Sequence, residues 1–220
     1  MGYSVREASS DADWRQAIAV IQHVYVSGGY TPAENAARFQ TRERLEAEGA
    51  MLIAVRESGE VLGATILLHV GSAMHQVAQP GEREFRLLGV APEARGEGVG
   101  AALVKECIAR CTKEGATALV LWTRPNMLAA QRLYERLGFQ RATERDEETP
   151  AVSRGWCTGW PSDLEQQLSG GAQDAVRPGV GHEGNRCRTT AQEGDHLLVV
   201  LVHVANVHEV LCQHIVTIAQ

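Results

Sequence analysis

The stretch EFRLLGVAPEARGEGVGAALV, residues 84–104, constrains the fold of this chain more than any other part of its sequence. An apolar strand at 85–90 runs into a short charged turn at 91–94, and a helix begins soon after. Three glycines near the start of this helix let the backbone approach a ligand, because they have no Cβ atom: Gly96, Gly98 and Gly100. The first amides of a helix have no partner inside it and lie at the positive end of its dipole. The pattern therefore predicts an anion site, most naturally for a phosphate group, with Arg95 as a charged donor at its rim.

Other phosphate-binding motifs fit this stretch less well. No Gly-Lys-Ser/Thr follows at the spacing of a P-loop. The letters Gly96-x-Gly98-x-x-Ala101 fit a dinucleotide-binding motif, but there the glycines follow the strand at once and the next strand ends in an acidic residue. Here residues 91–95 intervene, and the next strand, at 119–123, ends without a carboxylate. A glycine-rich turn that binds no ligand is the remaining alternative.

Together with a second segment, the glycine motif resembles the GCN5-related N-acetyltransferase (GNAT) family. That family has a strand, a short turn, the pattern Arg/Gln-x-x-Gly-x-Gly/Ala and then a helix, which Arg95-Gly96-Glu97-Gly98-Val99-Gly100 matches position by position. The second segment is similar to the block after the family's fifth strand: Asn126, Ala129, Ala130, Leu133, Tyr134, Gly138 and Phe139. The resemblance covers residues 3–150 and does not extend to the C-terminal quarter.

The resemblance implies an α/β fold in which helices flank a mixed, mostly antiparallel central sheet, and the fourth and fifth strands splay apart. The pantetheine arm of acetyl-CoA, the family's cosubstrate, would lie in that gap like an additional strand, bonded to the backbone of the fourth strand. The residues expected to bind acetyl-CoA are Leu88, Gly89, Val90, Arg95, Gly96, Glu97, Gly98, Val99, Gly100, Ala101 and Asn126. For Asn126 the alternative is an ordinary helix N-cap.

The implied reaction moves an acetyl group from acetyl-CoA to a primary amine. A base must take a proton from the amine, a donor must stabilise charge on the carbonyl oxygen, and an acid helps the thiolate to leave. We expect a backbone amide near Val90 to be the donor. By resemblance the acid is Tyr134, whose alternative role is to pack by its ring and donate its hydroxyl to a backbone carbonyl. Direct transfer would gain much of its rate from holding amine and thioester together.

Glu84 is the candidate base. It lies eleven residues before Arg95, the spacing at which histone-acetylating members of the family place their catalytic glutamate. In a regular strand Glu84, Arg86, Leu88 and Val90 share one face, so Arg86 could instead pair with Glu84. Glu82 and a water chain are the other contenders.

Two tryptophans and two histidines are further candidates for the acceptor side. Trp14 and Trp122 are expected in the core rather than around a substrate. His69 and His75 flank the link into the fourth strand, but a lone histidine is usually not a catalytic base.

The acceptor amine is not specified by the sequence, and a small-molecule amine is preferred to an amino acid or a protein N-terminus. The competing functional class is a regulatory module that binds acetyl-CoA without turnover. Tyr134 and the carboxylate on the fourth strand favour the enzyme.

Composition limits the classes of protein further. The net charge of −6 argues against nucleic-acid binding. No stretch reaches the roughly 18 apolar residues of a membrane span, and the start lacks the basic and apolar regions of a signal peptide, so a cytoplasmic protein is expected. Five cysteines, of which Cys107 and Cys111 share one helix, indicate reduced thiols rather than a disulfide framework. A homodimer is left open.

Periodicity and turn residues predict the order of elements. The expected strands are 3–7, 51–56, 61–69, 84–90, 118–123 and 139–144, the second and third of them forming a hairpin. The expected helices run from 11, capped by Asp11, to about 25, from 32 to about 47 after a Thr31 cap, and over 98–113 and 126–137.

The C-terminal quarter differs from the rest. We expect an acetyltransferase domain at 1–165, a Gly-rich linker at 166–195 and an apolar extension at 196–220. The extension is expected to be a buried strand plus a helix or second strand, docking on the sheet edge or on a partner chain. A metal set and a non-native extension are the alternatives, although His203, His208, Cys212 and His214 match no standard zinc spacing.

Overall fold

The computed structural model describes residues 2–145 and 198–203. Three expectations lie outside the described residues: the Gly-rich linker at 166–195, the part of the C-terminal extension beyond residue 203, and the metal set apart from His203. Among the described residues, no group of three or more His, Cys, Asp or Glu side chains is arranged to hold a metal ion. No helix in the described ranges is long and apolar enough to cross a membrane.

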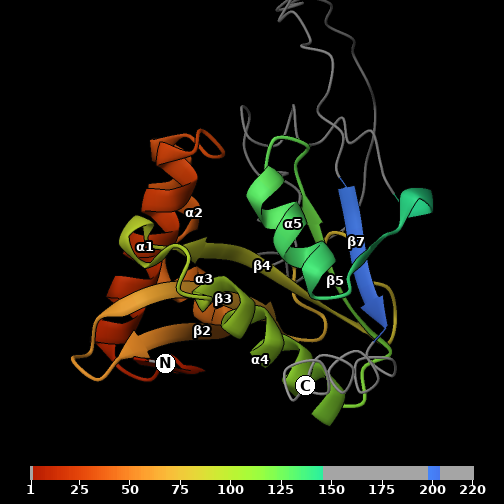
Figure 1. Ribbon diagram of the computed structural model, residues 1–220, viewed down its shortest axis with the longest axis horizontal. Coiled ribbons are helices and arrows are strands. Elements are labelled where there is room, and N and C mark those ends of the chain that lie inside the picture. Colours follow the sequence, from red (N-terminus) through yellow and green to blue (C-terminus); the bar gives the residue numbers. More distant parts are fainter. Residues whose placement is uncertain (1, 146–197, 204–220) are drawn as a thin grey trace, which may run out of the picture. The chain divides into compact units, whose positions relative to one another are not determined.

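Seven strands form one sheet in the order β1-β2-β3-β4-β5-β7-β6 (Figure 1). The strands are β1 Tyr3–Glu7, β2 Gly49–Arg56, β3 Val61–Leu68, β4 Glu82–Val90, β5 Ala118–Thr123, β6 Gln140–Arg141 and β7 Leu198–His203. All neighbouring strands are antiparallel except β4 and β5, which are parallel. This mixed, mostly antiparallel sheet with flanking helices confirms the expected fold class.

The C-terminal strand does not lie where the sequence indicated. β7 pairs with β5 along its whole length and with β6 at two positions, so it lies inside the sheet. The run thus joins the sheet as a strand beside β5, but it is not the outermost strand, because β6 lies beyond it. In place of the strand expected at 139–144, the chain forms only the two-residue β6, Gln140–Arg141.

The helices are α1 Asp11–Ser27, α2 Ala33–Phe39, α3 Arg42–Glu48, α4 Val99–Lys113 and α5 Leu128–Arg136. The N-cap of α1 is Ser10 rather than Asp11. Its hydroxyl accepts a hydrogen bond from the Asp13 N–H, and the Asp13 carboxylate accepts one from the Ser10 N–H, which makes a capping box.

The single helix expected from 32 to about 47 is two helices, α2 and α3. The chain leaves the helical conformation at Gln40, whose φ and ψ are −99° and 60°, and is extended at Thr41. The side-chain amide of Gln22 on α1 donates to the carbonyls of Ala36 and Gln40, so it provides partners at this break. Thr31 makes no cap, because α2 begins after Pro32 without a side-chain cap bond.

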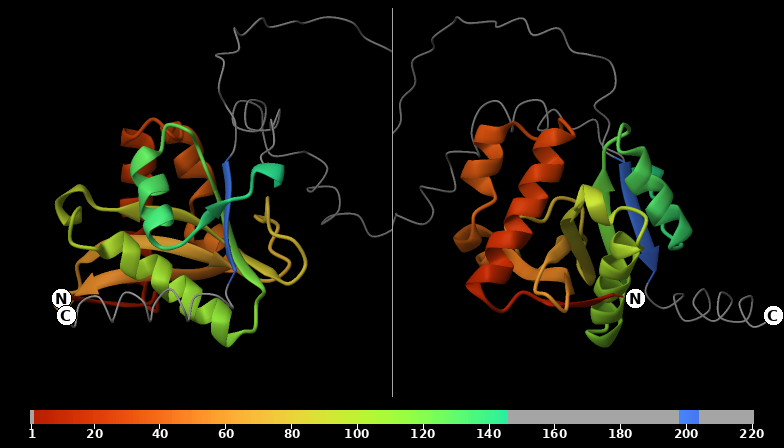
Figure 2. Two further views of the ribbon diagram at one scale, coloured as in Figure 1. Left: turned by 45° about the vertical axis from the view of Figure 1, so that its right-hand side comes forward. Right: turned by 60° about the vertical axis from the view of Figure 1, so that its left-hand side comes forward.

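Two hydrophobic clusters lie on opposite faces of the sheet. One packs α1 and α3 against β2 and β3, and includes Ile21, Leu45 and Ile53. The other packs α4 and α5 against the sheet, and includes Leu103, Tyr134 and Phe85. The right-hand view of Figure 2 separates α1 and α2 from α4 and α5. We refer to these as the α1 face and the α4 face.

Candidate functional site

The glycine motif forms a tight loop between β4 and α4. A 3-10 turn at Pro92–Ala94 follows β4, and the loop then passes through Gly96 and Gly98, whose φ angles are 87° and 81°. Side chains other than glycine rarely adopt this left-handed conformation, so the two positions require glycine. Gly98 is the N-cap of α4. The loop thus brings the chain to the start of the helix with no side chain over the backbone at either glycine.

The start of α4 presents unpaired amides. The first backbone hydrogen bond of the helix runs from the Ala102 N–H to the Gly98 carbonyl. The N–H groups of Val99, Gly100 and Ala101 therefore have no partner within the described part of the chain. Three converging amides at the positive end of a helix dipole make a site for phosphate oxygens.

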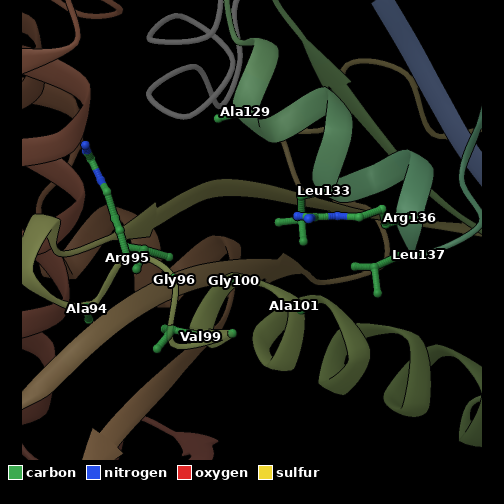
Figure 3. A pocket seen from close by; sticks show the side chains of 12 residues that line it. Ala94, Arg95, Gly96, Val99, Gly100, Ala101, Ala129, Leu133, Arg136 and Leu137 are labelled. Atoms are coloured by element: carbon green, nitrogen blue, oxygen red, sulfur yellow. The ribbon is translucent and has the colours of Figure 1, made fainter. Parts of the chain in front are cut away.

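A pocket of about 490 Å³ opens over these amides (Figure 3). Most of the expected acetyl-CoA residues line it: Val90, Arg95, Gly96, Gly98, Val99, Gly100 and Ala101. The helix α5 supplies an apolar wall, and this wall is close because residue 100 is glycine. A Cβ atom there would lie 3.2 Å from Cδ2 of Leu133.

Two guanidinium groups belong to the pocket. Arg95 and Arg136 are both exposed, and neither has an ion-pair partner in the ranges that the structure describes. In the view of Figure 3, Gly96 and Gly100 lie between them. Arg136 was missed by sequence reasoning, because a basic residue in the last turn of a helix is also what the helix dipole favours.

Glu97 lies in the loop but does not line the pocket. Its carboxylate pairs with Arg56 at 3.1 Å, and its carbonyl accepts a hydrogen bond from the Tyr3 hydroxyl at 3.2 Å. Glu97 therefore ties the loop to β1 and β2, and its expected contact with acetyl-CoA stays a prediction.

The parallel strands β4 and β5 form a fork. They pair only at their first residues, from Glu82 opposite Ala118 to Glu84 opposite Val120, and Figure 1 shows them diverging beyond that point. Leu88, Gly89 and Val90 follow on the β4 side without a β5 partner. They do not line the pocket, apart from Val90, but their strand edge remains available for an extended ligand.

A bulge in β4 changes which side chains share a face. Leu87 has φ 59°, and the register with β3 shifts between Ala64 and Ile66. Leu87 packs on the α1 face, whereas Leu88 and Val90 pack on the α4 face with Phe85. The expectation that Glu84, Arg86, Leu88 and Val90 share one face is wrong, since the extra residue reverses the alternation.

Residues 14–139, more than half of the chain, match the family model described as "Acetyltransferase (GNAT) family". The chain belongs to the GNAT acetyltransferase family. It is 40% identical over 92 residues to an uncharacterized N-acetyltransferase of Schizosaccharomyces pombe, an alignment covering 42% of this chain and 52% of that protein. It is 36% identical over 124 residues to a mycothiol acetyltransferase of an Arthrobacter species, covering 56% of this chain and 36% of that protein. The chain thus spans about half, or less, of these relatives.

Solved GNAT structures share the fold. An acetyltransferase of the family from Staphylococcus aureus Mu50 superposes with a TM-score of 0.56 at 12% identity, covering 92% of this chain and 99% of that one. The ribosomal-protein-S18-alanine N-acetyltransferase of Escherichia coli gives a TM-score of 0.52 at 15% identity, covering 92% and 94%. At these identities the likeness concerns the fold alone.

Tyr134, the candidate acid, is buried on α5 and does not line the pocket. Its ring packs against Phe85 and Phe139, with centroid separations of 6.0 and 5.7 Å. Its hydroxyl has no hydrogen-bond partner among the described residues, so a bond to a backbone carbonyl, the alternative role, is not present there. Burial raises the pKa of Tyr134, so the phenol keeps its proton at neutral pH.

Glu84 is completely buried on the α1 side of the fork. Its Oε2 accepts hydrogen bonds from the N–H groups of Gln76, Val77 and Ala78, at 3.0 to 3.2 Å. Its Oε1 is buried with no partner in the described chain. One oxygen therefore fixes the link before β4, while the other is not engaged. The rival Glu82 pairs with Arg145 at 2.9 Å, which ties its carboxylate to another role.

Arg86 does not pair with Glu84, although the sequence allowed it. Its Nη1 donates to the Met74 carbonyl at 3.0 Å, and its guanidinium lies over the Trp122 ring, 5.1 Å from the centroid. Trp14 belongs to the core as expected. Trp122 does not: it is half-buried, and its Nε1 is buried without a partner in the described residues.

Three other candidate side chains, Asn126, His69 and His75, do not line the pocket. Asn126 is exposed and is not an N-cap, because α5 begins at Leu128 with Met127 as its cap residue. His69 is exposed, and His75 is half-buried with its Nε2 unpartnered in the described part.

Proposed function

We propose that this chain is an N-acetyltransferase that moves an acetyl group from acetyl-CoA directly to the primary amine of a small molecule. The observation that carries the proposal is the pocket at the start of α4, where three unpaired amides and two guanidinium groups meet beside the open edge of β4. Family membership supports acetyl-CoA as the donor. A mycothiol acetyltransferase among the relatives supports a small acceptor.

The residues of the pocket would bind and orient the donor. The amides of Val99, Gly100 and Ala101 would hold the pyrophosphate, with Arg95 and Arg136 neutralising its charge. The edge of β4 at Leu88, Gly89 and Val90 would pair with the pantetheine amides. Asn126 would contact the same arm. This arrangement directs the thioester toward the fork between β4 and β5.

The transfer forms a C–N bond and breaks the C–S bond, while one proton leaves the nitrogen and one reaches the sulfur. Glu84 would take the proton from the attacking amine, and its unengaged Oε1 supports that role. A backbone amide near Val90 would stabilise the carbonyl oxygen. The protonated phenol of Tyr134 would donate to the departing sulfur.

The location proposed for this reaction is the cytoplasm. Cys107 and Cys111 are buried free thiols, which is the usual state of cysteine in a reducing compartment.

Thermal stability in acetyl-CoA tests the pocket first, with NADH as the comparison. A ligand at a hundred times its dissociation constant adds about 2.7 kcal/mol. We expect a rise in the unfolding midpoint with acetyl-CoA and none with NADH, followed by amine-dependent release of free thiol. Stabilisation without thiol release for any amine would favour the regulatory module, and a response to NADH alone would favour a dinucleotide site.

A pair of glycine variants makes the test specific to the loop. Gly98→Ala and Gly59→Ala each place a Cβ at a positive φ, of 81° and 86°, so both should lower stability by about 1–2 kcal/mol. Gly59 lies in the hairpin turn between β2 and β3, away from the pocket. Only Gly98→Ala should weaken stabilisation by acetyl-CoA. If acetyl-CoA stabilised both variants equally less than the wild type, the loop would not be part of the binding site.

A further inference from the structure

The α1 face of the fork carries a second set of polar groups, separate from the pocket on the α4 face. Arg86 on β4 and Trp122 on β5 each lie two residues beyond the last paired residues, Glu84 and Val120, so they stand where the strands begin to part. Arg86 bonds to Met74, which packs against the α1-face cluster together with Tyr25. This second set of polar groups therefore lies on the face of the fork opposite the pocket.

Most hydrogen-bond donors of the Arg86 guanidinium have no acceptor among the described residues. Its Nη1 donates one hydrogen bond, to the Met74 carbonyl, and it makes no ion pair with any described residue. The Nε and Nη2 edge therefore has no protein acceptor in the described chain. Burial lowers the pKa of Arg86, and the nearby charge of Glu84 opposes that effect. The Arg86 side chain is half-buried, and neither its Nε nor its Nη2 is among the buried unpartnered atoms of the described residues, so this edge is open to an anionic ligand.

A second unused donor lies beside it. Trp122, whose ring the guanidinium covers, has its Nε1 buried and unpartnered in the described ranges. Glu84 does not supply the missing acceptor, because its Oε2 holds three amides and it lies beyond ion-pair distance of Arg86. Arginine and indole N–H groups only donate, so the site calls for a ligand that only accepts. The Nε and Nη2 edge of a guanidinium matches a carboxylate with two parallel hydrogen bonds.

We propose that the amine acetylated by this chain also carries a carboxylate, and that Arg86 binds it on the α1 face of the fork. The inference rests on the proposed acetyl transfer and names its substrate class. The carboxylate keeps its charge throughout, and the amine of the same molecule forms the new C–N bond as the C–S bond breaks. Arg86 acts as a specificity-determining residue, since it holds the acceptor without exchanging a proton.

The test compares matched amines that differ only in the carboxylate. Glycine, β-alanine and γ-aminobutyrate are each assayed beside their carboxamides, with the full chain and saturating acetyl-CoA, by release of free thiol. In the best pair, kcat/KM for the carboxylate should exceed that for the carboxamide about 10- to 150-fold, the range of hydrogen bonds to a charged group. Arg86→Gln should bring this ratio to about one, mainly by raising KM for the carboxylate, and Arg86→Lys should restore only part of it.

Arg38→Gln is the matched control, because Arg38 also lies over an aromatic ring, that of Phe39, but is exposed on α2. It should leave the ratio unchanged. If Arg86→Gln lowered kcat/KM by the same factor for the carboxylate and for its carboxamide, Arg86 would have a structural role and the inference would be overturned. A wild-type chain that acetylates carboxamides as well as carboxylates would also overturn it, although acetyl transfer would then stand. No thiol release with any amine would overturn the proposed function itself, and the inference with it.

Discussion

At the scale of single residues, Tyr134 makes a clear prediction. Tyr134→Phe keeps the ring that packs against Phe85 and Phe139 and removes only the hydroxyl. If the phenol donates to the departing sulfur, turnover should fall about 100-fold, the lower end of what acid catalysis contributes. Stabilisation by acetyl-CoA should hardly change. Turnover equal to the wild type at saturating acetyl-CoA would assign Tyr134 to packing alone.

Sequence reasoning reached the pocket residues because their identities follow from backbone geometry. Gly96 and Gly98 occupy left-handed conformations, which favour glycine, so the spacing of glycines in the sequence indicates this backbone geometry. The roles of Arg136 and Glu97 could not be predicted in this way, because the sequence does not show which group an exposed charged side chain will contact. Glu97 pairs with Arg56, far away along the chain, and Arg136 reaches the pocket only because α5 packs beside α4.

At the scale of elements, periodicity and capping residues predicted where most strands and helices begin. These local patterns did not predict the features that depend on contacts between distant parts of the chain. The break between α2 and α3 depends on Gln22 of α1, and the bulge at Leu87 depends on the register with β3. The bulge matters for the site, because it places Arg86 on the α1 face and Leu88 on the α4 face.

The start of α1 gives a prediction about pH. The hydrogen bond from Arg6, at 2.8 Å, and the amides of Ser9 and Ser10 hold the pKa of Asp13 well below its ordinary value. A carboxyl with a depressed folded pKa stabilises the fold above its unfolded pKa of about 3.9, and this contribution is lost as the pH falls further. Asp13→Asn should cost about 1–3 kcal/mol at pH 7. The difference from the wild type should shrink between about pH 5 and pH 3.

Denaturant unfolding at several pH values measures this difference. Asp11→Asn is the control, because Asp11 is exposed on the same helical turn and also pairs with an arginine, Arg42. Its effect should be much smaller, since exposed ion pairs contribute little. A constant gap between Asp13→Asn and the wild type from pH 7 to pH 3 would contradict the assignment.

At the scale of the whole molecule, the C-terminal strand was the part that sequence could not place. The run around Leu198–His203 reads as a strand, but nothing local says which strands it joins. Its position between β5 and β6 is set by pairing across a long sequence separation. Such contacts are the ones that periodicity and turn residues do not encode.

The position of β7 makes the last prediction. Val200 lies opposite Leu121 of β5 and opposite Arg141 of β6, so whichever strand its N–H faces, proline there removes a donor from the ladder. Val200→Pro should lower the free energy of unfolding by at least about 1–3 kcal/mol. Glu57→Pro, in the turn closed by Gly59 and Arg56, should change it little. Because β5 forms one side of the fork, Val200→Pro should also reduce the rise in unfolding midpoint that acetyl-CoA produces. If the two variants had the same midpoint and the same rise with acetyl-CoA, β7 would support neither the sheet nor the binding site.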